Sequence, residues 1–307
     1  MPGSAAPTFT LFTPTYNRRH TLRRPYESLL AQTSRDFEWV VVDDGSTDGT
    51  EDLVRGWAAE GRLPMRYFRQ EHRGAHCAMN LGVREAQGMF FSKLDSDDAC
   101  RPETLARFAT LWAEMPPDLR EGFAGITGLC ENQRGERIGD AFPHSPLDAS
   151  PPELSYRYKV RGDKFGFLRT SALREHPQPE DVGGNFIPEG VLWHKIAQRY
   201  RTRYVNEVFL TVWLDQPSLT RGPSRAAVNA AGHRLLFMSM LNADLPWLRY
   251  APWRFLCGAA NYCRFSCHCG VSAPAQWADL HGLGAKLLWF LGAPLGWPLY
   301  WRDRLKS

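Results

Sequence analysis

The chain has 307 residues, of which 43% are hydrophobic and 23% charged, so it can bury a sizeable core, and global disorder is excluded. Seven cysteines at irregular spacings in so long a chain exclude a framework held by disulfides. The balance of 37 Lys and Arg against 33 Asp and Glu is mildly basic and by itself indicates no particular partner.

Strand and helix patterns alternate over the first 115 residues. The sequence predicts strands at 9–13, 37–42, 65–68 and 89–94, and helices at 21–32, 53–59, 75–86 and 103–115. The run FEWVVV at 37–42 is almost continuously apolar and rich in β-branched residues, which is typical of an interior parallel strand. The alternation therefore predicts an α/β fold with a mainly parallel sheet flanked by helices.

The pattern changes after Pro116. We expect strands at 123–130, 136–142 and 202–213, a proline-rich connector at 145–152 and a helix at 189–200. From residue 226 onward the pattern is helical and increasingly aromatic. These changes predict one α/β domain over 1–225, with halves at 1–115 and 116–225, and a C-terminal helical extension over 226–307.

Two predicted strands end in acidic residues. Asp43 and Asp44 follow FEWVVV, and Asp95 and Asp97 follow the next apolar strand but one. The carboxyl ends of parallel strands meet at one edge of a sheet, where ligands of such sheets gather. Two carboxylates spaced two residues apart can approach one hard cation, such as Mg²⁺ or Mn²⁺, which can neutralise a diphosphate. Asp98 either shares this site or caps the next helix.

Other phosphate sites lack their motifs in this chain. The glycine loop of NTPases and the glycine fingerprint of dinucleotide-binding folds are both absent. An aspartyl phosphatase would place its acids after the first strand, which here ends in Thr13-Pro14. The remaining interpretation is a metal–diphosphate site without a phosphate-cradling glycine loop.

Several spaced motifs agree in order with one known family. The stretch TPTYNRRHTLRRPYESLLAQTSRDFEWVVVDDGSTDGT, the segment around Asn80-Leu81-Gly82 and the acidic LDSDD closely resemble the family 2 glycosyltransferases. The resemblance covers roughly residues 8–115. It implies a GT-A nucleotide-sugar-binding fold and an inverting, metal-dependent glycosyltransferase.

The resemblance also implies residue roles in binding the nucleoside. Pro14, Thr15 and Tyr16 would line the base and ribose, and the Tyr16 ring offers a face on which uracil stacks. Asp44 would accept a hydrogen bond from the pyrimidine N3–H, with Asp43 as the second candidate for that role.

In the family that the sequence resembles, the acidic motif binds the metal. Asp97 matches the direct metal ligand of the family, and Asp95 would face the ribose or a water on the metal. Three further positions lie where the family lines the donor pocket, namely Arg73, His76 and Asn80.

Inverting transfer needs a carboxylate that takes the proton of the acceptor hydroxyl. In family members this base opens a helix about ninety residues beyond the acidic motif, and Glu189 occupies such a helix start here. Capping of that helix explains the same acid. Asp163, within Gly-Asp-Lys, is the second candidate. Ser218 and Arg221 resemble a loop that closes over the diphosphate, for which an arginine is suited.

The C-terminal fifth has its own composition. Six of the eleven tryptophans and seven basic against two acidic residues lie in 246–307. Gly292, Pro294 and Pro298 interrupt its apolar stretch, so we expect no membrane span. Interfacial rings and terminal basic residues favour a helix lying on a membrane surface, while packing on the α/β domain or a dimer contact would explain the same pattern.

The combined prediction is a glycosyltransferase that moves a sugar from a nucleotide sugar, UDP-linked, to a saccharide or lipid-linked acceptor in surface polysaccharide or glycolipid synthesis. The amino terminus lacks the pattern of a signal peptide, so we expect a cytoplasmic enzyme on the inner face of the membrane. The alternatives are an inactive nucleotide-sugar-binding scaffold and a sugar-nucleotide pyrophosphorylase. We expect no nucleic-acid partner, because the basic residues interleave with tryptophan only in the tail.

Overall fold

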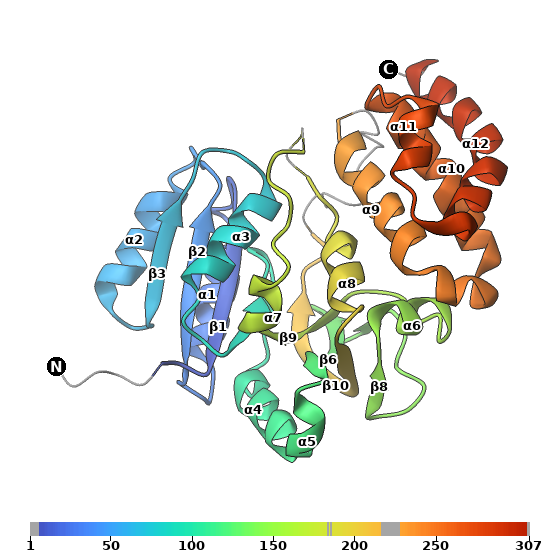
Figure 1. The fold of residues 1–307 in the computed structure, drawn as a ribbon. Coiled ribbons are helices and arrows are strands. Elements are labelled where there is room, and N and C mark those ends of the chain that lie inside the picture. The colour runs from blue at the N-terminus through green and yellow to red at the C-terminus, as the bar shows by residue number, and fades with distance from the viewer. Residues whose placement is uncertain (1–5, 183, 185, 216–227, 306–307) are drawn as a thin grey trace. The chain divides into compact units, whose positions relative to one another are not determined.

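The computed structural model describes residues 6–182, 184, 186–215 and 228–305, and these form two compact units (Figure 1). The first unit takes residues within 1–150, 160–177 and 200–216. The second takes residues within 151–159, 178–199 and 217–307. Each unit is therefore assembled from segments that alternate along the chain.

The first unit begins with the predicted alternation of strands and helices. In chain order these elements are β1 (Phe9–Thr15), α1 (Arg23–Leu30), β2 (Phe37–Asp43), α2 (Thr50–Glu60), β3 (Met65–Arg69), α3 (Ala75–Glu85), β4 (Phe90–Lys93), β5 (Ala99–Cys100), α4 (Thr104–Glu114) and α5 (Pro117–Arg120). The later elements are β6 (Phe123–Asn132), β7 (Arg137–Ile138), β8 (Leu147–Ala149), β9 (Lys164–Arg169), α7 (Thr170–Arg174) and β10 (Arg201–Val212).

The strands form one mixed sheet. Its main path runs β3-β2-β1-β4-β9-β6-β10-β5. The pairs β1–β2, β1–β4 and β2–β3 are parallel, as predicted, and so is β6–β10. Strand β9 is antiparallel to both β4 and β6. Since β9 runs against β4, the start of β9 lies at the edge where β4 ends.

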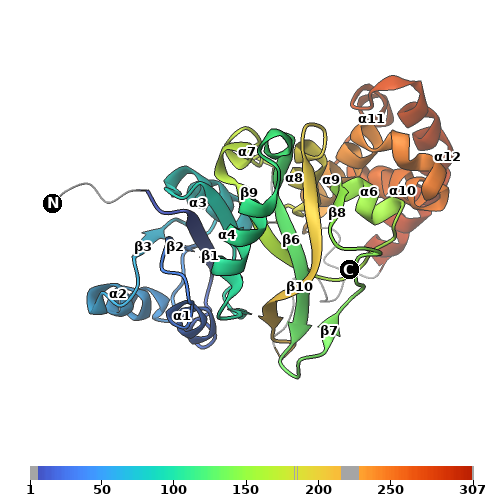
Figure 2. The same ribbon diagram turned by 90° about the horizontal axis from the view of Figure 1, so that it is seen from below.

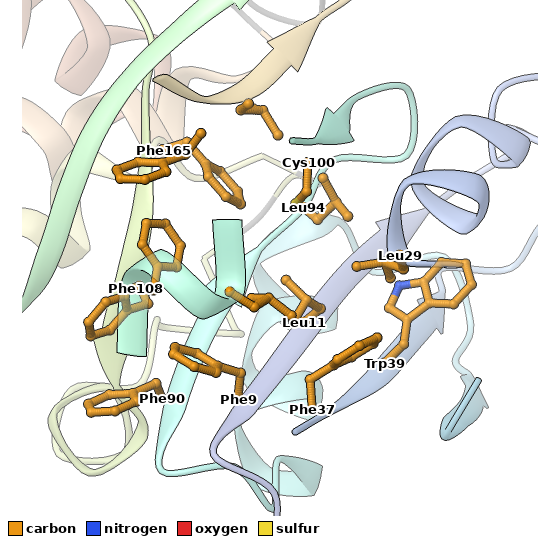
Figure 3. Close-up of a cluster of buried hydrophobic side chains, with 14 of the residues drawn as sticks. Phe9, Leu11, Leu29, Phe37, Trp39, Phe90, Leu94, Cys100, Phe108 and Phe165 are labelled. Carbon is orange, nitrogen blue, oxygen red and sulfur yellow. The ribbon is translucent and has the colours of Figure 1, made fainter. Parts of the chain in front are cut away.

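One face of the sheet is covered by α1, α2 and α4. Alternate residues of the strands point to this face, and they include the fully buried Phe9, Leu11 and Trp39 (Figure 3). Leu29 of α1 and Phe108 of α4 belong to the same cluster. Complete burial of each such side chain stabilises the fold by about 1.5–3 kcal/mol.

The opposite face of the sheet is covered by α3. Figure 2 shows α1 and α2 on one side of β1 and β2 and α3 on the other. Helix α3 approaches so closely that a Cβ at Gly82 would lie 2.4 Å from the ring of Phe12. Helices on both faces were predicted, and this contact explains why a glycine stands within a helix.

Several parts of the second half differ from the sequence prediction. The expected helix at 189–200 ends at Ile196, and the helix α7 was not predicted. The expected strand at 136–142 shortens to the two residues of β7. The expected connector at 145–152 contains β8, which pairs with β10, and then opens a helix. The antiparallel β9 was not predicted, although FGFL at 165–168 alternates as a strand. Gly166 lies within β9, and Gly125 lies on the neighbouring strand β6. A Cβ at either position would collide with the backbone of the other strand, so the two glycines permit the strands to approach closely.

The second unit is helical in the residues that the structure describes. Its elements are α6 (Pro151–Tyr156), α8 (Gly190–Ile196), α9 (Ala230–Ala243), a 3-10 helix (Leu245–Tyr250), α10 (Pro252–His268), α11 (Ala273–Ala278) and α12 (Gly282–Leu305). Tyr156, Leu241, Phe255 and Tyr262 are buried together in its core. The predicted helical C-terminal region is confirmed.

Helix α12 continues through Pro294 and Pro298, the two prolines that interrupt its apolar stretch. Gly292 and Gly296 pack directly on α10, so that a Cβ at Gly292 would lie 2.7 Å from the side chain of Ala259. Close helix–helix packing of this kind compensates for the backbone hydrogen bonds that Pro294 and Pro298 remove. Among the described helices, none is long and apolar enough to cross a membrane.

Candidate functional site

The parallel strands β1, β2 and β4 end at one edge of the sheet, and the candidate site residues follow these ends. Thr15 lies opposite Asp43 in the β1–β2 register. In the β1–β4 pair, Phe12 lies opposite Lys93, two residues before Asp95. Tyr16, Asp44 and the acidic turn after β4 thus emerge at the same edge, as the sequence predicted.

Asp43 is fully buried and bonded within the chain. Its Oδ1 accepts a hydrogen bond from the Ser46 backbone N–H at 2.8 Å, and its Oδ2 accepts one from the Tyr67 hydroxyl at 2.8 Å. Burial and the neighbouring Asp43 raise the pKa of Tyr67, so its hydroxyl stays a donor. These contacts give Asp43 a structural role in shaping the turn after β2.

Asp44 organises the loop before α3. Its Oδ1 accepts hydrogen bonds from the Gln70 side chain at 2.7 Å and from the Arg73 backbone N–H at 2.9 Å. Its Oδ2 accepts one from the Gly74 backbone N–H at 2.9 Å and lies 2.8 Å from Nδ1 of His72. The buried carboxylate is therefore the point at which the β3–α3 loop is joined to β2.

Tyr16 stands at the surface with one face covered. Its ring stacks on the His72 imidazole with centroids 4.0 Å apart and planes 16° apart. Beside it, the buried hydroxyl of Thr15 has no hydrogen-bond partner within the described residues. A buried polar atom without a partner at the end of a strand is the kind of group that a ligand satisfies.

The remaining donor-side candidates lie on or just before α3. Arg73 contributes its backbone N–H to Asp44, while its side chain is exposed. His76 and Asn80 are both buried on α3. The structure thus brings Arg73 to the Asp44 carboxylate, and it places His76 and Asn80 in the helix that covers the sheet.

The acidic turn after β4 concentrates three carboxylates. Burial and the nearby Asp95 raise the pKa of Asp97. Burial, Asp95 and Asp97 together raise the pKa of Asp98 to about 8. Asp98 does not cap α4, because the N-cap position of that helix is Glu103 and it has no side-chain cap hydrogen bond. The Oδ1 of Asp98 instead accepts a hydrogen bond from the Trp213 backbone N–H at 3.3 Å. The raised pKa values mark a position that favours an added positive charge.

Two arginines face this turn, and no pattern in the sequence marks them as part of it. Arg18 and Arg24 both act to lower the pKa of Asp97, against the larger effect of burial. Arg24 donates to the Asp97 carbonyl at 3.3 Å and forms an ion pair with Asp215 at 2.6 Å. Its guanidinium lies 4.9 Å from the centre of the Trp213 ring. Only the tertiary structure shows this role, because α1 and the end of β10 are far apart in sequence.

Asp163 lies directly before β9, and its charge contributes to the raised pKa of Asp98. In the antiparallel β4–β9 register Phe91 lies opposite Leu168, so Asp163 falls at the end where the acidic turn begins. The amine of Lys164 donates to the Asp163 carbonyl at 3.4 Å, and burial lowers its pKa. Asp163 therefore belongs to the same edge as the acidic turn.

The carboxylates suit a hard divalent cation with few protein ligands. No group of three His, Cys, Asp or Glu residues within the described ranges could hold a metal ion. Mg²⁺ is commonly bound through one or two carboxylates together with substrate phosphates and waters. Asp97 and Asp95 supply such oxygens, and Lys93 lies 2.9 Å from one oxygen of Asp95. The donor set thus fits a cation that is completed by a diphosphate.

Glu189 belongs to the second unit. It stands at the N-cap position of α8, after Pro188, so the predicted helix start is confirmed. Val191, Leu192 and Ile196 of that helix are buried, as their spacing predicted. Ser218 and Arg221, the two candidates for a loop over the diphosphate, lie outside the described residues.

Comparison with known proteins identifies the family. The model of glycosyl transferase family 2 matches residues 10–165. A GalNAc(5)-diNAcBac-PP-undecaprenol beta-1,3-glucosyltransferase of Campylobacter jejuni is 24% identical over 82% of this chain and 80% of its own. The putative teichuronic acid biosynthesis glycosyltransferase TuaG of Bacillus subtilis is 34% identical over 55% of this chain and 63% of its own.

Solved structures share the fold. TarS residues 1–349 of S. aureus in complex with UDP-GlcNAc superpose with a TM-score of 0.62 at 19% identity, covering 98% of this chain and 92% of that one. The mannosyltransferase PcManGT from Pyrobaculum calidifontis, in complex with GDP-Man and Mn2+, gives 0.53 at 21% identity over 98% and 83%. The fold is therefore that of GT-A enzymes, and the chain is a glycosyltransferase that belongs to glycosyl transferase family 2.

Proposed function

We propose that this glycosyltransferase transfers a sugar from a UDP-linked donor, with inversion and with a divalent metal, to a lipid-linked saccharide. The observation that carries the proposal is the convergence of Tyr16, Asp44, Asp95 and Asp97 at one edge of the sheet. A nucleobase requires an aromatic face and a buried group that accepts a hydrogen bond, which Tyr16 and Asp44 provide. A metal–diphosphate requires carboxylates, which the acidic turn provides.

The base would bind between Tyr16 and the Asp44 carboxylate. Uracil carries a ring N–H that a carboxylate accepts, and cytosine and adenine lack such a donor at the corresponding position. Thr15, with its buried and unpartnered hydroxyl, offers one further polar contact close by. A UDP-GlcNAc complex among proteins of the same fold is in accord with a uridine nucleotide.

The diphosphate would lie beside the acidic turn. Asp97 would hold a Mg²⁺ or Mn²⁺ ion, with Asp95 facing it directly or through water. A divalent ion supplies charge stabilisation for the departing diphosphate. Arg18 and Arg24 already face Asp97, and they limit the repulsion among the carboxylates before the ion binds.

The acceptor hydroxyl requires a base, and we assign that role to Glu189, with Asp163 as the second candidate. Glu189 occupies the N-cap position of α8, where its side chain makes no capping hydrogen bond to the helix. An ionised carboxylate accepts the acceptor's proton as the new glycosidic bond forms. We assign donor binding to residues 1–115 and acceptor binding to 116–225.

The acceptor class follows from helix α12. Its exposed face carries Leu283, Leu287, Phe290, Leu291 and Trp301, while its opposite face packs on α10. Basic residues stand near both ends of the helix, at Lys286, Arg302 and Arg304. An apolar face with rings and flanking cations suits the headgroup region of an anionic membrane. A lipid-linked acceptor presented at the inner face of the cell membrane would be met there, in surface polysaccharide or glycolipid synthesis.

Thermal unfolding in the presence of UDP-, GDP- and dTDP-sugars, each with and without Mn²⁺, tests the donor and the metal. A ligand that binds the folded state raises the Tm in a concentration-dependent way. We expect the largest shift with a UDP-sugar and Mn²⁺, and we expect Asp97→Ala to remove the part that depends on Mn²⁺. Shifts that are equal for all three donors, or a metal effect that survives in Asp97→Ala, would contradict the assignment.

A further inference from the structure

The side chain of His72 lies against both groups that we assign to the nucleobase. Its imidazole stacks on Tyr16 with centroids 4.0 Å apart and planes inclined by 16°. Its Nδ1 lies 2.8 Å from Oδ2 of Asp44 and 3.2 Å from the Asp44 carbonyl oxygen. A proton on Nδ1 makes this nitrogen a donor to the carboxylate.

The Asp44 carboxylate has no further position for a donor while His72 is in place. A carboxylate offers about four lone-pair positions. Three of them are taken by the Gln70 side chain and the backbone N–H groups of Arg73 and Gly74. The fourth is taken by His72, whose side chain is 42% exposed. Two of the four donors are side chains, Gln70 and His72, and either can turn away without moving the backbone. Only rotation of His72 also uncovers the ring of Tyr16.

A flat ring stacked on an aromatic face and donating an N–H to a buried carboxylate presents the same contacts as a pyrimidine imide. We infer that His72 occupies the position of the nucleobase in the unliganded enzyme, and that the donor base replaces it there. The inference rests on the proposed function, since it takes Tyr16 and Asp44 as the base-binding groups. It adds a residue that sets donor affinity by competing for the site.

The backbone around His72 is held, so the exchange involves the ring. The backbone N–H of Gln70 donates to the Asp43 carbonyl at 2.9 Å. Gly45, with φ of +88°, packs against this segment so closely that a Cβ there would lie 3.1 Å from the His72 backbone nitrogen. Rotation about the side-chain torsions of His72 is sufficient to uncover the face of Tyr16 and one lone pair of Asp44 Oδ2.

The same contacts predict which bases can replace His72, and here the selecting group is the Asp44 carboxylate. A base that replaces His72 must restore an N–H donor to Asp44, because a buried carboxylate position left empty costs free energy. Uracil, thymine and guanine carry such a ring N–H, whereas cytosine and adenine present an acceptor nitrogen. Cytosine and adenine can stack on Tyr16, but they do not restore to Asp44 the hydrogen bond that it loses when His72 turns away.

Calorimetric titration with UDP tests the inference on the full chain. Removal of the competing ring in His72→Ala should tighten UDP binding by about threefold to tenfold, which corresponds to an uncovered site in roughly a third to a tenth of the unliganded molecules. The exposed His281, in the second unit, provides a matched control, and His281→Ala should bind UDP as the unmodified chain does. Equal or weaker UDP binding by a folded His72→Ala protein overturns the inference.

Proton NMR of the histidine rings tests the displacement of His72 directly, in the unmodified chain. The Cε1–H resonance of His72, assigned by its absence in His72→Ala, should shift upfield through the ring current of Tyr16 and return downfield when UDP is added. A resonance that stays in place at saturating UDP overturns the inference while leaving the proposed function intact. Absence of UDP binding in the unmodified chain would instead overturn the proposed function.

Discussion

The carboxylate of Asp44, at the end of a central strand, accepts a hydrogen bond from the backbone N–H of Gly74 at 2.9 Å. The same carboxylate accepts from Arg73, so two consecutive backbone donors at the start of α3 converge on one side chain. Gly74 has φ of +97°, a conformation that residues with a Cβ rarely adopt. The loop conformation and the carboxylate therefore depend on one another.

Asp44→Asn should lower both stability and UDP binding. The amide keeps one acceptor oxygen and turns an NH₂ group toward donors, so at least one backbone N–H loses its partner. Loss of hydrogen bonds to a charged group costs about 1.5–3 kcal/mol each. Thermal unfolding and UDP titration measure the two effects. Asp52→Asn, at an exposed position in the first turn of α2, is the matched control and should change neither. Unchanged UDP binding in Asp44→Asn would remove Asp44 from the base site.

Glu189→Gln should lower kcat for transfer by about 10²–10⁴-fold while leaving donor binding unchanged. A general base contributes about 10²–10⁴-fold to the rate, and the amide cannot take a proton. The measurement is kcat for sugar transfer together with the Kd for UDP. Asp163→Asn distinguishes the two candidates, because only the residue that accepts the proton should reduce kcat by that factor. A large loss in Asp163→Asn with full activity in Glu189→Gln would reverse the assignment.

The fold of the first 115 residues could be predicted because its signals are local. FEWVVV is apolar apart from Glu38 because β2 is covered on both faces, and the helices that follow begin within three residues of their predicted starts. β9 was missed because its partners lie about forty to eighty residues away, so tertiary pairing determines it. The continuity of α12 through Pro294 and Pro298 also depends on tertiary contacts, since packing on α10 outweighs the local cost of proline.

The candidate site could be predicted only in part. The paired acids after β2 and β4 were visible in the sequence because parallel strands place their carboxyl ends together. Arg24 was not visible, since its partner Asp215 is 191 residues away. His72 precedes the Arg73-Gly74 pair in a loop, and no periodic pattern marks a ring that stacks on Tyr16. A histidine placed between a strand and the first turn of a helix was the one available signal.

The second unit should lose stability in acid through Asp303. Burial alone would raise the pKa of this carboxyl, but hydrogen bonds from Arg264 at 2.8 Å and His268 at 3.1 Å hold it below the usual value. A carboxyl with a lowered pKa in the folded state contributes stability above its unfolded pKa of about 3.9, and the contribution disappears as the pH falls below that value.

Asp303→Asn should therefore destabilise the second unit by about 1–3 kcal/mol at pH 7 and by less at pH 3, because the contribution of Asp303 is lost as the pH falls through its lowered pKa in the folded state. Tryptophan fluorescence reports on this unit, because six of the eleven tryptophans lie in 246–307. Glu27→Gln removes the exposed Arg23–Glu27 pair and should have almost no effect at either pH. A difference between Asp303→Asn and the unmodified chain that is the same at both pH values would refute the linkage.

Charge placed on the exposed face of α12 should release the protein from anionic membranes. Phe290 and Leu291 are 67% and 61% exposed, so substitution of both by Glu leaves the core of the unit intact. Each such side chain contributes about 1.5–3 kcal/mol when it leaves water, so the double variant should bind vesicles at least about tenfold more weakly. Cosedimentation with vesicles containing phosphatidylglycerol measures the change.

Met89→Glu with Leu119→Glu replaces two exposed apolar side chains of the first unit and should leave vesicle binding unaltered. Equal loss in both double variants would assign the effect to net charge, and retention by the α12 variant would exclude this face as the membrane contact.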